Sequence, residues 1–151
     1  MRVSGEPDLR ELEAVDWNTC RTAFGHASDF PDLIRSAASP YSFQESVDAL
    51  LDECFCADNG FFPCCLPTFP FFMQLLAIDL HERQEHLIWW LAIWIADIKT
   101  NRLWTQDGTI EQALLNEFKR FRDVFKTLEN HSSPYISIEA TKILQTLDLA
   151  Y

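Results

Sequence analysis

Four of the five cysteines lie within one short stretch, ECFCADNGFFPCCLP, as Cys54, Cys56, Cys64 and Cys65. Thiols at this density can bind zinc, form disulfides or pack in a core. Zinc takes four converging ligands, usually from cysteines separated by two to four residues. On a helix, Cys54 and Cys56 point about 200° apart, and adjacent cysteines rarely hold one ion together. The spacing therefore favours buried thiols at a joint between two helices over a metal site, with a redox role as the remaining alternative.

A second stretch, HERQEH, carries His81 and His86 and is similar to the zinc-protease motif H-E-x-x-H. That motif places its histidines four residues apart, so that both rings face one ion. Here they are five apart, about 140° around a helix, and one zinc ion cannot accept both. The acidic residue after His81 is typical of a first helical turn, where negative charge complements the helix dipole. We predict a solvated helix start and no metal.

Other catalytic patterns are missing from the sequence. Its four glycines form neither a phosphate-binding loop nor a nucleophile elbow. His26 and His131 lie in turn-like sequences with no nucleophile patterned beside them. We predict a protein that is not an enzyme and needs no cofactor, although scattered carboxylates could still converge in the fold.

The chain is strongly acidic, with 12 Lys and Arg against 23 Asp and Glu and a net charge of -11. Residues 1–60 hold 12 of the acids and four of the bases, and no lysine precedes Lys99. Such a surface repels phosphate groups, so we predict no nucleic-acid partner. It either aids solubility or attracts a cationic protein partner.

The N-terminus, MRVSGEPDLREL, has charges where a signal peptide has its apolar segment. The longest apolar run, LIWWLAIWIA, has ten residues, about half of what a membrane span needs. We therefore predict a cytoplasmic protein with reduced thiols and no membrane segment.

Apolar residues recur every three and four positions, a spacing typical of amphipathic helices. The pattern is clear in SVDALLDECF, HLIWWLAIWI and ALLNEFKRFRDVFKTL, and no strand-like alternation is sustained. Breaks at residues such as Gly25, Pro40, Asp79 and Gly108 divide the chain into segments of ordinary helix length. The sequence predicts an all-α protein.

The helices repeat with a period near 40 residues. A shift of 39 to 40 places FPDLIRSAAS (30–39) on FPFFMQLLAI (69–78) and the apolar positions of the following helices on one another. We expect three helix pairs, at about 29–57, 66–98 and 109–148, after one or two short helices between Asp8 and Phe24. Two helices per repeat are typical of a right-handed α-solenoid of HEAT type. Residues 1–151 would then form a single domain.

Two runs carry a family resemblance: VDWNTCRTAFGHASDFPDLIRSAAS and SVDALLDECFCADNGFFPCCLPTFPFFMQLLA. Over about residues 15–98 they resemble small bacterial HEAT-repeat proteins of the PBS-lyase HEAT-like kind. The matching pieces, in order, are Asp16-Trp17, Phe24-Gly25-His26-Ala27, Phe30-Pro31, Asp58-Asn59-Gly60 and Thr68-Phe69-Pro70-Phe71-Phe72. The family has H-Q-G where this chain has Asp58-Asn59-Gly60, so a role of that histidine and glutamine is not carried over. The resemblance implies a helical binding module such as the immunity protein of a toxin system.

Two functions follow as hypotheses. The first is an immunity protein that binds a cognate, basic toxin domain and blocks its active site, because an acidic inhibitor is steered to a cationic groove. The second is a HEAT-repeat scaffold that joins other proteins without inhibiting them. An adjacent gene for a larger, toxin-like protein would favour the first.

The acidic first half supplies the predicted binding surface. We expect carboxylates on the second helix of the first pair to steer the partner and two phenylalanines on the adjoining turn to anchor it. The residues are Asp48, Asp52, Glu53, Asp58, Asn59, Phe61 and Phe62, with Trp104 and Asp107 as the alternative surface. The sequence leaves Ile88, Trp89 and Ile93 either in the centre of a bundle or in an exposed apolar patch.

Overall fold

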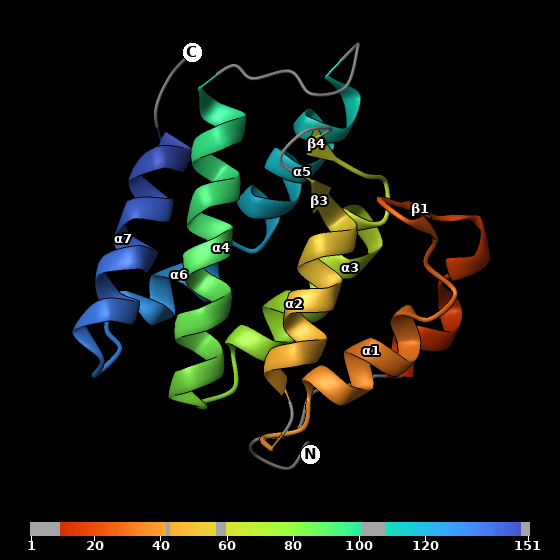
Figure 1. Ribbon diagram of the computed structural model, residues 1–151. Helices are drawn as coiled ribbons and strands as arrows, with labels where there is room; N and C mark the ends of the chain where they lie inside the picture. Colours follow the sequence, from red (N-terminus) through yellow and green to blue (C-terminus); the bar gives the residue numbers. More distant parts are fainter. Residues whose placement is uncertain (1–9, 42, 57–59, 101–107, 149–151) are drawn as a thin grey trace.

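The computed structural model describes residues 10–41, 43–56, 60–100 and 108–148, and most of them are helical (Figure 1). The α-helices are α1 Phe30–Ala37, α2 Phe43–Cys54, α3 Cys65–Leu76, α4 His81–Lys99, α5 Thr109–Arg120, α6 Arg122–Leu128 and α7 Pro134–Asp148. Two short 3-10 helices, η1 Arg10–Ala14 and η2 Trp17–Thr19, precede them. Two-residue strands pair antiparallel as β1 Arg21–Thr22 with β2 Gly25–His26 and as β3 Phe55–Cys56 with β4 Gly60–Phe61. The predicted all-α class is confirmed.

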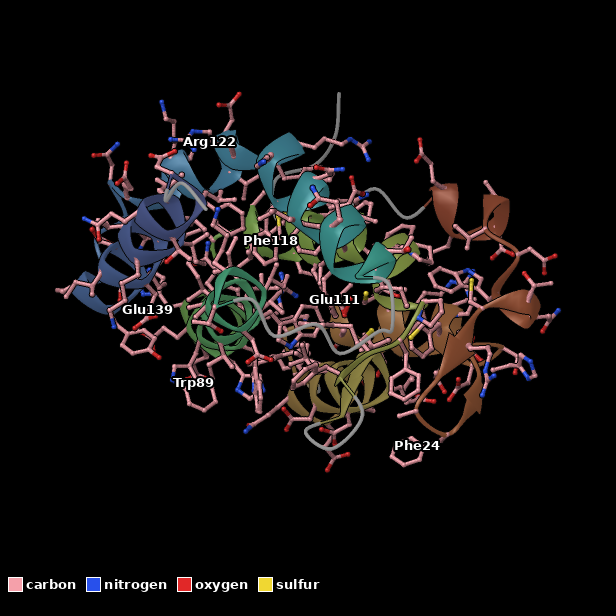
Figure 2. The ribbon with its side chains drawn as sticks, turned by 90° about the horizontal axis from the view of Figure 1, so that it is seen from above. Phe24, Trp89, Glu111, Phe118, Arg122 and Glu139 are labelled. Atoms are coloured by element: carbon pink, nitrogen blue, oxygen red, sulfur yellow. The ribbon has the colours of Figure 1, made fainter. Side chains whose placement is uncertain are left out.

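The helices lie in two layers. At the front of Figure 1, α2, α4 and α7 stand side by side, and α4 contacts both of its neighbours. Behind them α3 contacts α5, and α6 packs on α7. Figure 2 shows the layers from above, with α3, α5 and α6 on the side of α4 opposite to Trp89. The face formed by α2, α4 and α7 is therefore the outer surface of one layer.

The predicted helix pairs correspond to α1 with α2 and α3 with α4. The third unit differs, because the helix expected over 109–128 ends and restarts at Phe121, which has φ −101° and ψ 21°. Phe118 and Phe125 are seven residues apart, and in a straight helix that separation corresponds to a rise of about 10 Å along the axis. The bend instead brings the rings of Phe118 and Phe125 to 5.9 Å between centroids, nearly parallel. Stacking of two buried aromatic rings thus accompanies the break.

The segment before α1 is only partly helical. Its two 3-10 turns were expected as short helices, but residues 21–26 form the β1–β2 hairpin. Gly25 has φ +143°, a conformation that side chains disfavour, and so allows the chain to reverse there. Trp17 fastens the segment to the core: its indole N–H donates to the Leu12 carbonyl at 2.9 Å, and its ring packs on Phe30 and Phe71.

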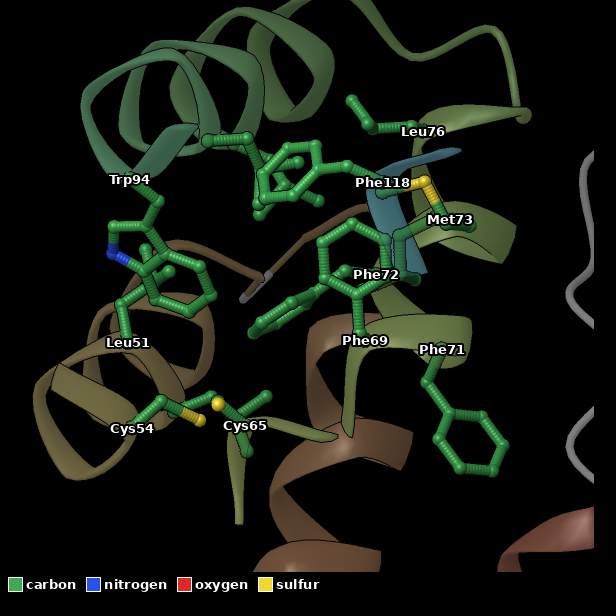
Figure 3. Close-up of a cluster of buried hydrophobic side chains, with 14 of the residues drawn as sticks. Leu51, Cys54, Cys65, Phe69, Phe71, Phe72, Met73, Leu76, Trp94 and Phe118 are labelled. Atoms are coloured by element: carbon green, nitrogen blue, oxygen red, sulfur yellow. The ribbon is translucent and has the colours of Figure 1, made fainter. Parts of the chain in front are cut away.

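The core is connected from Leu12 to Leu147 and is rich in aromatic rings (Figure 3). Trp94 of α4 belongs to this core and is fully buried. Its ring contacts Phe61 edge-on at 5.5 Å and Phe72 at 6.0 Å. Phe69 meets Phe118 of α5 at 4.8 Å, which joins the third unit to the second.

Helix α4 contacts α2, α3, α5 and α7 and is the central helix of the fold. This position explains its apolar run, because most of its surface faces other helices. Ile88 is fully buried and Ile93 partly so, whereas Trp89 is 44% exposed. Burial within the bundle is confirmed for Ile88, whereas Trp89 lies at the surface and Ile93 is intermediate. None of the helices in the described part of the chain is long and apolar enough to cross a membrane.

A buried guanidinium links α4 to α1. Arg83 is 1% exposed, and its Nη1 donates to the carbonyls of Ala37 at 3.2 Å and Ala38 at 3.1 Å. These carbonyls end α1, where backbone acceptors have no partner in the helix and the dipole is negative. Burial lowers the pKa of the Arg83 guanidinium, and the charge is balanced by this helix end.

We expect Arg83→Ala to lower the free energy of unfolding by about 2 to 4 kcal/mol, because it leaves a cavity and removes the donor of two carbonyls. Arg83→Met fills the space and should recover about half of the loss. Urea denaturation at neutral pH measures both. Arg120→Ala is the control, because Arg120 makes an exposed pair with Glu117 at 3.2 Å, worth at most about 1 kcal/mol. Equal losses for Arg83→Ala and Arg120→Ala would contradict the role given to Arg83.

Candidate functional site

An open groove of about 400 Å³ runs across the layer of α2, α4 and α7. Helix α4 contributes four of the groove's described lining residues, and α2 and α7 contribute the others. We call it the acidic groove and define it by its lining: Phe43, Gln44, Glu82, Glu85, His86, Trp89 and Tyr135.

Exposed aromatic side chains gather at this groove. Trp89 is 44% exposed and Tyr135 is 40% exposed, and the adjacent Ile138 on α7 is 55% exposed. Trp89 is held from one side by the ring of Trp90, edge-on at 4.9 Å. In Figure 2 the Trp89 ring points away from the core into solvent. An exposed apolar surface flanked by charged residues is a feature of binding sites.

The groove is negatively charged. Glu82 and Glu85 stand on α4, and Asp48 of α2 lies 2.5 Å from the Nε2 atom of His86. Glu85 accepts a hydrogen bond from the Ser133 hydroxyl at 3.2 Å, which orients its carboxylate. The pKa of Tyr135 is raised by burial and further by the charges of Glu139 and Glu85. Carboxylates from two helices therefore act on the same phenol.

No lysine or arginine lines the acidic groove among the residues that the structure describes. The nearest cation on α7, Lys142, is paired with Glu139 at 3.2 Å. Aromatic faces beside carboxylates bind lysine or arginine side chains well, because the cation gains both ion pairs and contact with the ring. The groove is therefore chemically suited to a basic side chain of a protein partner.

The structure separates the carboxylates predicted for the binding surface. Asp48, half-buried, adjoins the groove through His86, and Asp52 is exposed one turn further along α2. Glu53 instead faces the β1–β2 hairpin, where it accepts a hydrogen bond from the Thr22 hydroxyl at 3.3 Å. Its pKa is raised by burial and by the charge of Asp29. Five residues along a helix correspond to about 140°, which turns Glu53 away from Asp48.

The prediction of an exposed anchor at Phe61 is wrong. Phe61 is 3% exposed, and its ring packs on Phe55 at 4.6 Å and on Trp94 at 5.5 Å. The short β3–β4 pairing turns the side chain into the core, and Phe62 is partly buried against the same core. Four predicted residues lie outside the described part of the chain: Asp58, Asn59, Trp104 and Asp107.

Sequence reasoning did not select Glu82, Glu85 and Tyr135 for the binding surface. They come from segments about 50 residues apart, and no local pattern connects them. The sequence holds one signal for this surface: Trp89 lies off the apolar stripe of its helix, a position compatible with either core or surface.

Three of the four thiols predicted to be buried are buried, and the side chain of Cys56 lies outside the described part of the structure. Cys54, Cys64 and Cys65 are fully enclosed where α2 meets α3, and the sulfur atoms of Cys54 and Cys64 lie 3.7 Å apart (Figure 3). Burial raises the pKa of Cys54 and Cys65 well above the usual value, so both stay protonated. Protonated, enclosed thiols are poor nucleophiles and poor metal ligands. Their role here is packing.

A cluster of Asp79, His81 and His131 was not foreseen from the sequence. The Oδ1 atom of Asp79 is 3.4 Å from Nε2 of His81 and 3.3 Å from Nε2 of His131. The three potential ligand atoms lie within 4.8 Å of one another, close enough to hold a metal ion. His131 follows α6 and is 50 positions from His81, which is why the sequence did not reveal the pair.

The hydrogen bonds of His131 argue against a metal at this cluster. The backbone N–H of Ser133 donates to Nδ1 of His131 at 2.9 Å, so that nitrogen carries no proton. The neutral ring then has its proton on Nε2, which faces Oε1 of Gln84 at 3.1 Å and Asp79. A metal-bound Nε2 needs its lone pair, and the opposite nitrogen normally donates. We interpret the cluster as a hydrogen-bond network.

We expect long-range proton–nitrogen NMR spectra at pH 8 to show His131 as the Nε2–H tautomer. One equivalent of zinc should leave its signals unchanged, because binding would require Nδ1 to take a proton that the Ser133 N–H opposes. His26, exposed on β2, serves as the reference ring. A zinc-induced switch of His131 to the Nδ1–H tautomer would establish a metal site.

These features define an all-α protein with an acidic, aromatic groove on one layer. In comparisons with known proteins, no family model, no curated protein and no solved structure matches the chain. The resemblance to small HEAT-repeat proteins therefore stays a prediction.

Proposed function

We propose that this protein is an immunity protein, a cytoplasmic antitoxin that binds a cognate basic toxin domain through the acidic groove and blocks its active site. The observation that carries the proposal is the combination of exposed Trp89 and Tyr135 with Glu82 and Glu85 in one groove, whose described lining residues include no lysine or arginine. Carboxylates speed the encounter with a cationic partner, and exposed aromatic residues provide anchors once the two surfaces meet.

The chemistry of such a toxin explains why its inhibitor would be negatively charged. A domain that attacks nucleic acid presents cationic side chains to phosphate groups, and an acidic inhibitor competes for the same side chains. The net charge of -11 supplies long-range attraction in addition to the local contacts. An inhibitor that acts by occupying this surface needs no catalytic residue.

The HEAT-type arrangement belongs to the same proposal. The order of helices, with α2, α4 and α7 adjacent in one layer and α3 against α5 in the other, is what stacked helix pairs produce. Such a stack presents a broad, rigid face, which suits a binding module. The alternative function, a HEAT-repeat scaffold that joins proteins without inhibiting them, would use the same face.

Co-expression with the product of the adjacent gene tests the function. We expect the two proteins to co-purify, and we expect cells that express the neighbour alone to stop growing unless this protein is also present. Binding without rescue would favour the scaffold. If the two proteins neither bind nor restore growth together, the immunity role is refuted for this gene pair.

A further inference from the structure

A second cavity lies on the other side of α4. It has a volume of about 460 Å³ and is bounded by the turn between α3 and α4, by α6 and by the start of the turn that leads to α7. In Figure 2, Arg122 at the start of α6 and Trp89 of the acidic groove lie on opposite sides of the molecule. We call this cavity the α6 pocket. It is distinct from the acidic groove, with which it shares no lining residue.

The wall of the α6 pocket is fixed by a chain of hydrogen bonds. Gln84, 2% exposed, donates from Nε2 to the Leu76 carbonyl at 2.8 Å. Its Oε1 atom accepts from Nε2 of His131 at 3.1 Å, and Nδ1 of His131 accepts from Ser133. The side-chain amide of Gln84 and the ring nitrogens of His131 thus have partners within the protein. The pocket has its shape before any ligand arrives.

The lining of the α6 pocket combines apolar side chains with two carboxylates. Ala77, Val124 and Leu128 provide the apolar contacts. Asp79 and Asp123 line the pocket and are both exposed, and the lining includes no lysine or arginine among the residues that the structure describes. A pocket of this size, mostly apolar with a few converging polar groups, is typical of sites for small molecules.

We propose that the α6 pocket binds a small organic amine, with its apolar body on Val124 and Leu128 and its ammonium group at Asp79 and Asp123. A carboxylate ligand would meet two like charges, and a neutral ligand would gain no ion pair with Asp79 or Asp123. An ammonium group gains charge-assisted hydrogen bonds to both. The proposal goes beyond the proposed function and does not depend on it.

The test uses the full-length protein labelled with nitrogen-15. Two amines, 2-phenylethylamine and cyclohexylmethylamine, are titrated beside two matched neutral or anionic compounds, 2-phenylethanol and phenylacetate. We expect at least one amine to bind with a Kd of about 1 mM or lower and to shift the amides of Val124, Thr127 and Leu128. The alcohol should bind about tenfold more weakly, and the acid should not bind.

Two variants make the test specific. Asp79→Asn with Asp123→Asn should weaken the amine about tenfold and leave the alcohol unchanged, because each amide loses the negative charge but keeps an oxygen that can accept, as Asp79 does beside His131. Asp32→Asn with Glu11→Gln removes two exposed charges on the side of α1 and should have no effect. Any one of four results would overturn the proposal. These are equal affinity for amine and alcohol, full amine affinity in the first variant, chemical shifts confined to the Trp89 indole, and no binding of either amine.

Discussion

Changing Glu82 and Glu85 together to lysine is expected to slow association with the co-purified partner by about tenfold to a thousandfold. The reversal places positive charge in a groove that, in the unchanged protein, attracts cations through carboxylates on two helices. The rate of dissociation should change less, because the aromatic contacts of Trp89 and Tyr135 remain. Stopped-flow measurements over a range of salt concentrations separate the two rates, and the salt dependence of association should vanish or reverse.

Two further variants control for this result. Glu82→Gln with Glu85→Gln removes the charge and keeps an oxygen that can accept the hydrogen bond from Ser133, so it should give an intermediate rate. Glu11→Lys with Asp32→Lys makes the same change of net charge away from the groove and should have a much smaller effect. If this distant variant slows association equally, overall charge and not the groove directs the partner.

Replacing Trp94 by alanine is expected to lower the free energy of unfolding by about 3 to 5 kcal/mol. The indole is fully enclosed and contacts Phe61, Phe72 and Phe55, from β4, α3 and β3, so its loss opens a cavity between several elements. Trp94→Phe keeps part of the volume and should lose less. Chemical denaturation followed by circular dichroism measures the change.

Trp89→Ala is the matched control, because it removes the same side chain from an exposed position on the same helix. We expect it to cost about 1 kcal/mol or less in stability. Its main effect should fall on binding, where loss of an aromatic anchor speeds dissociation. A loss of stability as large as that of Trp94→Ala would show that Trp89 belongs to the core and would remove it from the groove.

The helices and their pairing could be predicted from periodicity. Each helix leaves an apolar stripe in the sequence because neighbouring residues three and four apart share one face, a property of the local backbone. The boundaries expected for the first two pairs agree with α1 to α4 within a few residues. The enclosure of Cys54, Cys64 and Cys65 followed from the same stripes and from the spacing of the cysteines.

The binding surface was predicted less well. Phe61 looked like an exposed anchor beside a turn, yet the β3–β4 pairing turns it onto Trp94. Glu53 was grouped with Asp48 because both are acidic residues of one helix, yet they face different neighbours. Proximity along the chain was a poor guide because the direction of a side chain depends on what packs around its element.

Local rules thus account for the all-α class, for the position of the helices and for the thiols that pack between α2 and α3. Interactions between distant segments decide the rest: Tyr135 of α7 and Glu85 of α4 line the same groove, and His131 meets Asp79 and Gln84 only after the chain bends at Phe121. The physical reason is the range of the interactions. Helix formation depends on residues within a turn or two, whereas a groove, a pocket or a hydrogen-bond network depends on burial and charge shared by segments that meet only when the core closes.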